Sequence, residues 1–303
     1  MMRKTHILLL LAATTCFAVP AMAQELTGTL KKIKDTGTIT IGHRDSSIPF
    51  SYYDDKQNVV GYAIDLCMKV ADEVKAELKM PDLKVKLNPV TSSTRIPLIA
   101  NGTIDIECGS TTNNLERQQQ AWFSPTYFVI TTKFVTKKGS AIKSFKDLKG
   151  KTVSTTAGTT SAKLLAEMNS KDDYKMNVIS AKDHAEGFLL VESGRAEAFA
   201  MDDILIYGLI ANSKTPDNYV LSNDWLTIEP YGAMLRKDDK PFKDVVDRAF
   251  NKIFASGEVE TLYKKWFLSP IPPRGVNLNV PLSPLLKKVF EHPTDSGDPK
   301  AYE

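Results

Sequence analysis

The chain contains little cysteine and little histidine. Its 303 residues include three cysteines and four histidines, and the histidines lie far apart, at positions 6, 43, 184 and 292. There is no CxxC, no HExxH and no cluster of Cys and His residues. Zinc sites need such closely spaced ligands. The sequence therefore carries no metal signature, and we expect neither a metal ion nor a cofactor.

The chain also has no excess of charge of one sign. It has 39 Lys and Arg residues against 36 Asp and Glu residues, and removal of a leader that contains Arg3 and Lys4 would leave 37 against 36. Nucleic-acid binding requires a basic patch, and basic clusters such as "LLKK" are typical of solvated faces. We expect no nucleic-acid partner and no binding to a membrane surface.

Only one long apolar run is present, near the N-terminus. Arg3 and Lys4 precede "ILLLLAATTCFAV", which is short for a membrane span, and the small-residue motif "AMA" ends at Ala23. A basic start, a short apolar stretch and an A-x-A site are typical of a secretory signal peptide. We therefore interpret residues 1–23 as a signal peptide that is cleaved near Ala23, which would also remove Cys16.

Two cysteines, Cys67 and Cys108, would remain after cleavage. In an oxidising compartment they could form a disulfide. The alternative is that both are free thiols that pack in a core as small apolar side chains, and this is the alternative that we expect.

Strand-like and helix-like patterns alternate twice along the chain. In "GYAIDLCMKVADEVKAEL", Ile64, Cys67, Ala71, Val74 and Leu78 recur at helical spacing, so Cys67 should face a core. The first run has strands at 38–42, 83–87 and 103–108 and helices at 61–78 and 94–102; the second has strands at 151–156, 176–180 and 196–201 and helices at 160–168, 184–194 and 202–211. This alternation predicts an α/β fold of two lobes, each a mostly parallel sheet flanked by helices.

The remaining segments suggest how the lobes are connected. "YFVITTKFVTK" is extended and could cross from one lobe to the other, and "PYGAMLRK" is typical of a return strand. Two helices at 241–256 and 257–267 have no sheet of their own, so they should complete the first lobe. The expected parts are residues 24–130 for lobe 1, 131–226 for lobe 2, 227–269 for the return to lobe 1, and 270–303 for a surface tail with a disordered end.

Polar side chains follow nearly every predicted strand. In open α/β sheets, ligands bind beyond the carboxyl ends of the strands. The stretches at these positions include "HRDSS", "TSSTR", "GSTTNNLER", "TAGTTS" and "SAKDH". From them we take ten candidate ligand-binding residues: Arg44, Ser92, Arg95, Ser110, Thr112 and Arg117 in lobe 1, and Thr159, Thr160, His184 and Asp202 in lobe 2.

Three arginines and one acid suggest the chemistry of the ligand. The planar fork of arginine fits a carboxylate, hydroxyls and backbone N–H groups fill the remaining lone pairs, and a lone carboxylate suits an ammonium group. An amino acid with two carboxylates fits this set. A structural interpretation is also open, because a single arginine is commonly a surface residue and Asp202 could be a helix N-cap.

At these motifs the sequence resembles the periplasmic glutamate/aspartate-binding proteins of bacterial amino-acid ABC transporters. The resemblance rests on "GHRDSSIPFSYYDD", "TSSTRIPL", "NGTIDIECGSTTNNLERQ", "AGTTS", "ISAKDH", "ESGRAEAFAMDD" and "LSPIPPRGVNLN", which cover almost all of the chain after the leader. It implies a type II periplasmic binding protein fold with two crossings, a periplasmic location and hinge closure around the ligand. The implied partners are L-glutamate or L-aspartate and membrane permease subunits, and we expect a monomer.

The resemblance also implies a role for nine of the ten candidate residues, all except Thr159. Arg117 would bind the ligand's α-carboxylate, with help from Ser110, Thr112 and the backbone N–H of Thr160, and Asp202 would bind the α-ammonium. The side-chain carboxylate would be bound by Arg44, Ser92, Arg95 and His184.

One departure concerns the cysteines. The relatives carry a second cysteine in the segment that here reads "YGAML", where it would pair with the one at Cys108, and this chain has Ala233 there. The family's own disulfide therefore cannot form, and whether Cys67 replaces it depends on a distance that the sequence does not supply.

Two other functions stay open at this point. The first is an enzyme, because dehydratases that act on small carboxylic acids use the same fold; we expect no catalysis, since His184 and Asp202 are already explained as ligand contacts. The second is a detached sensor domain. The sequence shows no signalling segment that would support this function.

Overall fold

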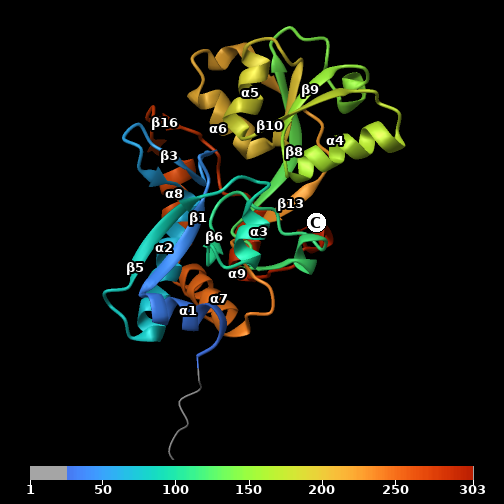
Figure 1. The fold of residues 1–303 in the computed structure, drawn as a ribbon. Coiled ribbons are helices and arrows are strands. Elements are labelled where there is room, and N and C mark those ends of the chain that lie inside the picture. The colour runs from blue at the N-terminus through green and yellow to red at the C-terminus, as the bar shows by residue number, and fades with distance from the viewer. Residues whose placement is uncertain (1–25, 303) are drawn as a thin grey trace, which may run out of the picture.

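The computed structural model describes residues 26–302 and has two α/β lobes, as predicted (Figure 1). Lobe 1, lower in the view, contains the N-terminal and most C-terminal helices, and lobe 2 consists of the green and yellow middle of the chain. The proposed signal peptide lies outside the described residues. Within residues 26–302, no helix combines the length and apolarity that a membrane span requires.

The sheet of lobe 1 has the strand order β5-β1-β6-β14-β7. β1 pairs parallel with β5 and β6, so the carboxyl ends of these three strands lie at one edge, while β14 pairs antiparallel with β6 and β7. The strands are β1 (Thr38–His43), β5 (Lys84–Pro89), β6 (Ile106–Glu107), β7 (Ala121–Phe123) and β14 (Met234–Arg236). A small second sheet is formed by β2 (Ser46–Ser47), β3 (Ser51–Tyr53) and β4 (Val59–Val60).

The helices of lobe 1 cover this sheet and include the two that were predicted at 241–256 and 257–267. They are α1 (Gly28–Thr36), α2 (Tyr62–Leu78), α3 (Arg95–Ala100), α7 (Lys240–Ala255) and α8 (Glu258–Phe267). The predicted inner face of α2 is confirmed, because Ile64, Cys67, Ala71, Val74 and Leu78 are all buried. Burial of such an apolar stripe is the main stabilisation that a surface helix gains.

The sheet of lobe 2 has the strand order β10-β9-β11-β8-β12. β9 pairs parallel with β10 and β11, and β11 pairs antiparallel with β8. The elements are β9 (Thr152–Thr156), β10 (Asn177–Ala181), β11 (Ala198–Asp202), β12 (Tyr219–Leu221), α4 (Thr160–Lys171), α5 (His184–Glu192), α6 (Asp203–Asn212) and the 3-10 turns η2 (Phe145–Leu148) and η3 (Pro216–Asn218).

Two antiparallel strands connect the lobes. β8 (Phe128–Lys137) pairs with β13 (Ile228–Tyr231) through its first four residues, and with β11 of lobe 2 from Thr132 onwards. The extended segment that was expected to cross between the lobes is therefore β8. The chain returns beside it through β13, so both crossings lie next to each other.

The tail after Ser269 is ordered to Tyr302, so the prediction of a disordered end is wrong for the described residues. It contains β15 (Pro270–Ile271), β16 (Val276–Asn277), α9 (Pro284–Glu291) and η4 (Pro299–Tyr302). Phe290 of α9 stacks on Phe254 of α7 at 5.1 Å between ring centroids. Tyr302 is buried, and its hydroxyl lies 2.7 Å from Thr126 Oγ1. Apolar burial in lobe 1 therefore holds a segment whose polar, proline-rich composition suggested disorder.

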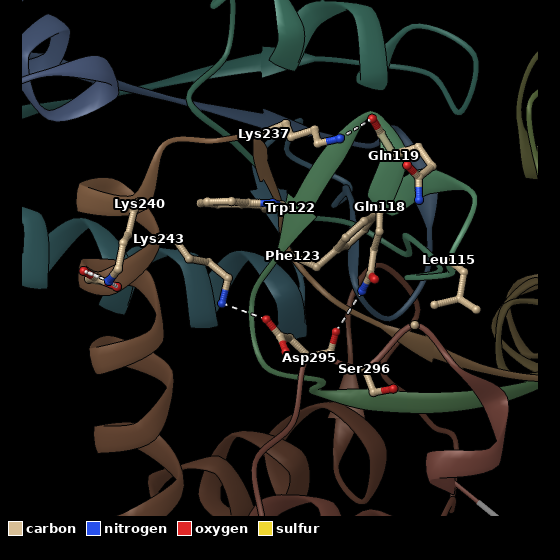
Figure 2. A pocket seen from close by; sticks show the side chains of 12 residues that line it. Leu115, Gln118, Gln119, Trp122, Phe123, Lys237, Lys240, Lys243, Asp295 and Ser296 are labelled. Atoms are coloured by element: carbon tan, nitrogen blue, oxygen red, sulfur yellow. Dashed lines mark hydrogen bonds and ion pairs between the residues drawn. The ribbon is translucent and has the colours of Figure 1, made fainter.

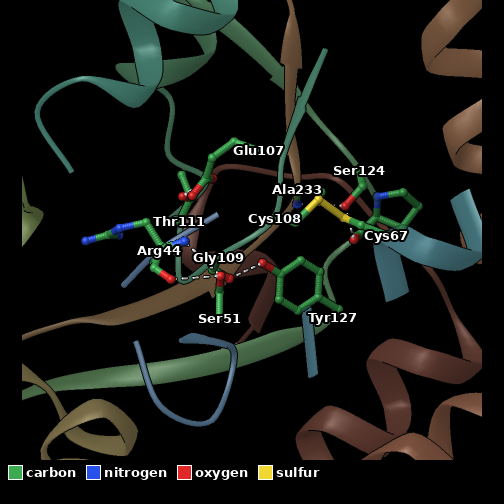
Figure 3. Close-up of a disulfide and its surroundings, with 11 residues drawn as sticks. Arg44, Ser51, Cys67, Glu107, Cys108, Gly109, Thr111, Ser124, Tyr127 and Ala233 are labelled. Atoms are coloured by element: carbon green, nitrogen blue, oxygen red, sulfur yellow. Dashed lines mark hydrogen bonds between the residues drawn. A yellow bond between two sulfur atoms is a disulfide. The ribbon is translucent and has the colours of Figure 1, made fainter. Parts of the chain in front are cut away.

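Cys67 and Cys108 form a disulfide, which corrects our expectation of two free thiols (Figure 3). The Cα atoms are 6.3 Å apart, within the range that a disulfide requires. The inward face of α2 brings Cys67 to the end of β6, where Cys108 follows the last strand residue. Ala233 lies beside the bridge. Both cysteines are buried as expected, but they are joined rather than merely packed.

Candidate functional site

The predicted residues gather where the strands of the two lobes end and face each other. Arg44 follows β1, Ser92 and Arg95 follow β5, and the loop with Ser110, Thr112 and Arg117 follows β6. In lobe 2, Thr159 and Thr160 follow β9, His184 follows β10, and Asp202 ends β11. The five ionisable members are only 1% to 8% exposed. Burial of this many charged groups is costly unless each is paired or receives a ligand.

Arg44 meets His184 across the boundary between the lobes. Its Nη2 donates to Ser92 Oγ at 2.8 Å and lies 3.4 Å from His184 Nε2, while His184 Nδ1 lies 2.9 Å from Thr156 Oγ1. Burial lowers the pKa of His184 well below its usual value, and the neighbouring Arg44 and Arg95 lower it further. His184 is therefore a neutral ring at neutral pH. Arg44 Nη1 is buried and has no partner among the described residues.

Arg95 is held by a short chain of side chains that ends on a carboxylate. Its Nη1 donates to Thr111 Oγ1 at 2.5 Å and to the Ser110 carbonyl at 3.3 Å, and Thr111 Oγ1 donates to Glu107. Figure 3 shows Glu107, Thr111 and Arg44 together at this place. Arg95 Nε and Glu107 Oε1 are both buried without a partner within residues 26–302. Unpaired arginine N–H groups are donors that an anionic oxygen would satisfy.

Arg117 lies at the other end of the cluster. Its Nη1 donates to the Thr112 carbonyl at 2.8 Å, and its Nη2 donates to the carbonyl of Gly158 in lobe 2 at 3.3 Å. Burial, followed by repulsion from Arg95, lowers the pKa of Arg117 to about 10, so it stays charged at neutral pH. The backbone carbonyls fix the position of its fork, and no carboxylate within residues 26–302 pairs with it directly.

Asp202 is buried next to Tyr231 and Ser161. The Tyr231 hydroxyl donates to Asp202, and Ser161 Oγ lies 3.5 Å from Asp202 Oδ1. Burial, followed by repulsion from Glu229, raises the pKa of Asp202 to about 7. Asp202 is the residue before α6, but its side chain makes no capping hydrogen bond. The N-cap interpretation therefore does not explain this side chain.

The remaining hydroxyl residues have different environments. Thr159 is the N-cap of α4, because it accepts from the N–H of Ala162 at 3.1 Å. Ser110 Oγ donates to Ser47 Oγ at 3.2 Å. Thr112 and Thr160 both donate to Glu229, at 2.7 Å and 2.8 Å. The structure thus gives Thr159 a capping role and joins Thr112 to Thr160 through Glu229.

Sequence reasoning missed two buried acids of this cluster, Glu107 and Glu229. Three buried arginines and three buried carboxylates therefore meet here, where the sequence suggested three arginines and one acid. Glu107 lies in the predicted strand 103–108 and was counted as an ordinary strand residue, whereas Glu229 directly precedes the predicted return strand "PYGAMLRK" and was assigned to no element. The available signal for Glu107 was the presence of an acid in a strand that was expected to be buried, because such an acid needs a partner.

The lobes touch each other around the cluster. Lys163 of lobe 2 pairs with Glu116 of lobe 1. Two glycines of lobe 2 lie against lobe 1 with no room for a side chain: a Cβ at Gly158 would be 2.7 Å from the backbone N of Ser93, and one at Gly208 would be 2.6 Å from the carbonyl oxygen of Ile48. The structure is therefore a closed arrangement of the two lobes.

A separate cavity of about 620 Å³ lies on the outside of lobe 1 (Figure 2). It is lined by Trp122 and by side chains of η1 (Arg117–Gln119), α7 and the tail. Lys237 donates to the Gln119 carbonyl at 2.8 Å, and Lys243 pairs with Asp295 at 2.9 Å. None of the ten predicted residues lines this cavity, so it is distinct from the candidate site.

Comparison with known proteins gives a family and close relatives. The model of the bacterial extracellular solute-binding proteins, family 3, matches residues 39–269. An L-glutamate/L-aspartate-binding protein of Pseudomonas aeruginosa is 57% identical over 279 residues, which is 92% of either chain. A glutamate/aspartate import solute-binding protein of Escherichia coli strain K12 is 51% identical over 267 residues, 88% of either chain.

Solved structures agree on the fold. An ancestral arginine-binding protein bound to arginine has a TM-score of 0.69 and 28% identity, and the match covers 76% of this chain and 98% of that one. An ancestral amino acid-binding protein, a precursor of cyclohexadienyl dehydratase, has a TM-score of 0.66 and 30% identity over 79% of this chain and 99% of that one.

Proposed function

The chain belongs to the bacterial extracellular solute-binding proteins of family 3, and from this premise we propose that it captures L-glutamate or L-aspartate and delivers it to the permease of an ABC importer. The observation that carries the choice of ligand is the pair Arg44 and Arg95, which are both buried and each carry an N–H group that has no partner within residues 26–302. The names of the relatives, which are 51% to 57% identical, support the same ligands.

The proposed site divides the ligand between two ends. Arg117 binds the α-carboxylate, assisted by Ser110, Thr112 and the backbone N–H of Thr160, and Asp202 binds the α-ammonium. Arg44 and Arg95, with Ser92 and His184 holding Arg44 in place, bind the side-chain carboxylate. The two lobes close around the ligand by a change at the crossings β8 and β13, which is a hinge motion.

The finer features of this function are part of the same proposal. The protein would be secreted into the periplasm, with its signal peptide cleaved near Ala23, and would act as a monomer that catalyses no reaction. The similarity to a dehydratase precursor keeps an enzyme as the alternative, but that precursor is itself described as an amino acid-binding protein. Product analysis after incubation with the bound acid would separate the two functions.

The test of the ligand is calorimetric titration of the purified protein, without residues 1–23, with glutamate, aspartate, glutamine and asparagine. We expect the two acids to bind at least about a hundredfold more tightly than the two amides, because an amide leaves buried arginine charge without a partner. Comparable affinity for glutamate and glutamine would contradict the assignment.

A further inference from the structure

Glu229 joins both lobes and both crossings through one carboxylate. It lies on β13 and is 6% exposed. Its Oε2 accepts from Thr112 Oγ1 at 2.7 Å and from Thr160 Oγ1 at 2.8 Å. Its Oε1 accepts from Thr227 Oγ1 at 2.7 Å, and Thr132 Oγ1 of β8 lies 2.7 Å from that hydroxyl.

The two threonines on Oε2 come from opposite lobes and from the middle of the candidate site. Thr112 lies in the loop after β6, two residues beyond Ser110, and forms a β-bridge with Tyr231. Thr160 is the first residue of α4, directly after the strand end that faces the cluster. Thr112 and Thr160 therefore meet on one oxygen only when the lobes are together.

The chemistry of these contacts fixes the direction of each hydrogen bond. An ionised carboxylate can only accept, and a threonine hydroxyl has one hydrogen and two lone pairs. The single hydrogens of Thr112 and Thr160 are therefore directed to Glu229, and only their lone pairs are left for a ligand. A ligand carboxylate has no hydrogen to give to them, whereas an ammonium group has three.

We propose that Glu229 is a positioning residue that turns Thr112 and Thr160 into acceptors for the ligand's α-ammonium. The neighbouring contact agrees with this, because Tyr231 lies two residues further along the same strand and donates to Asp202. Residues two apart on a strand share a face, so Glu229 and Tyr231 organise the same end of the ligand. The inference rests on the proposed function and moves Thr112 from the carboxylate to the ammonium.

Glu229 also acts on Asp202 through its charge. The groups that face Asp202 are Ser161 of α4, Asp203 of α6, Arg117 of the loop after β6, and Tyr231 and Glu229 of β13. Among the charged groups, Glu229 contributes most to the raised pKa of Asp202. Removal of the negative charge at Glu229 should therefore lower the pH at which Asp202 loses its proton and becomes able to bind an ammonium.

The test is Glu229→Gln, compared with the wild-type protein and with Glu260→Gln, which removes a charge from an exposed position in the first turn of α8. Glutamate affinity is measured by titration calorimetry from pH 5.5 to 8.5, and glutarate, which lacks the ammonium, is measured by competition. We expect Glu229→Gln to weaken glutamate at pH 8 by about tenfold to a hundredfold, to narrow the ratio between glutamate and glutarate, and to lower the midpoint of the pH profile. Glu260→Gln should do none of these.

Thr112 gives a second variant pair in case Glu229→Gln does not fold, which a melting curve would reveal. Thr112→Val should narrow the ratio between glutamate and glutarate, whereas Thr112→Ser keeps the hydroxyl and should preserve it. An unchanged ratio in Thr112→Val, or a folded Glu229→Gln with the wild-type midpoint, overturns the inference. If the wild-type protein binds neither glutamate nor aspartate, the proposed function fails first.

Discussion

Arg44 Nη2 and His184 Nε2 lie 3.4 Å apart, and the two side chains come from opposite lobes. An arginine N–H can only donate, so His184 Nε2 accepts and the ring hydrogen lies on Nδ1, which faces Thr156 Oγ1 at 2.9 Å. His184 in this arrangement has no N–H left for a ligand carboxylate. Its part in the proposed site is to hold Arg44 in place.

Replacement of His184 tests this role. His184→Ala should weaken glutamate binding by about tenfold, since one hydrogen bond to a charged group is lost. His184→Gln offers an amide oxygen to Arg44 and should retain more of the affinity. Titration calorimetry of both variants checks the order. Equal losses in the two variants would show that an acceptor for Arg44 is not what this position supplies.

The pKa of Asp202, about 7, makes glutamate binding depend on pH. Below pH 7 the ligand-free carboxyl holds a proton that the ligand's ammonium must displace, so affinity should fall by up to about tenfold per pH unit as the pH decreases. Above pH 7 the affinity should level off. Titrations across pH 5.5 to 8.5 measure the slope, and Asp202→Asn should bind weakly with no such slope between these limits. His184 should not contribute, because its pKa lies well below the usual value.

Arg95 and Arg117 should affect the two ends of the ligand differently. Loss of one partner of a buried charge pair costs roughly 3–5 kcal/mol, so Arg95→Ala and Arg117→Ala should each weaken glutamate by about two to four decades. Arg95→Ala should also narrow the gap between glutamate and glutamine, whereas Arg117→Ala should lower both together. The reverse pattern in the same titrations would mean that the ligand lies the other way round.

The disulfide predicts the result of a thiol count. The protein without its leader, denatured under non-reducing conditions, should show no free thiol. Replacement of both Cys67 and Cys108 by serine should lower the free energy of unfolding by about 4 kcal/mol, as expected for a bridge across 41 residues. Denaturant unfolding of both proteins measures the difference. Two reactive thiols in the unmodified protein would contradict the bridge.

The sequence predicted the features that depend on local pattern. The period of Ile64 and Cys67 in α2 reflects a single buried face. Polar residues follow β1, β6 and β11, at the strand ends where open α/β sheets generally bind ligands. Both signals can be found within a short window. They were sufficient for the two-lobed α/β fold and for the positions of the candidate residues.

The missed features depend on contacts between distant segments. The approach of Cys67 to Cys108 is set by how α2 packs on the sheet, and the order of the tail is set by the burial of Tyr302 against lobe 1. The acids Glu107 and Glu229 look like ordinary strand residues until the partners from other elements are known. The direction of the Thr112 hydroxyl follows from one of these acids and could not be predicted without it.

The two glycines at the seam between the lobes offer a way to hold the molecule open. A Cβ added at Gly158 would lie 2.7 Å from the backbone N of Ser93, and one added at Gly208 would lie 2.6 Å from the carbonyl oxygen of Ile48. A single methyl group at either position would therefore keep the two lobes apart, while the side chains of the arginine cluster stay unchanged. Such a variant would separate the first encounter with a solute from its enclosure, two steps that the native chain performs together.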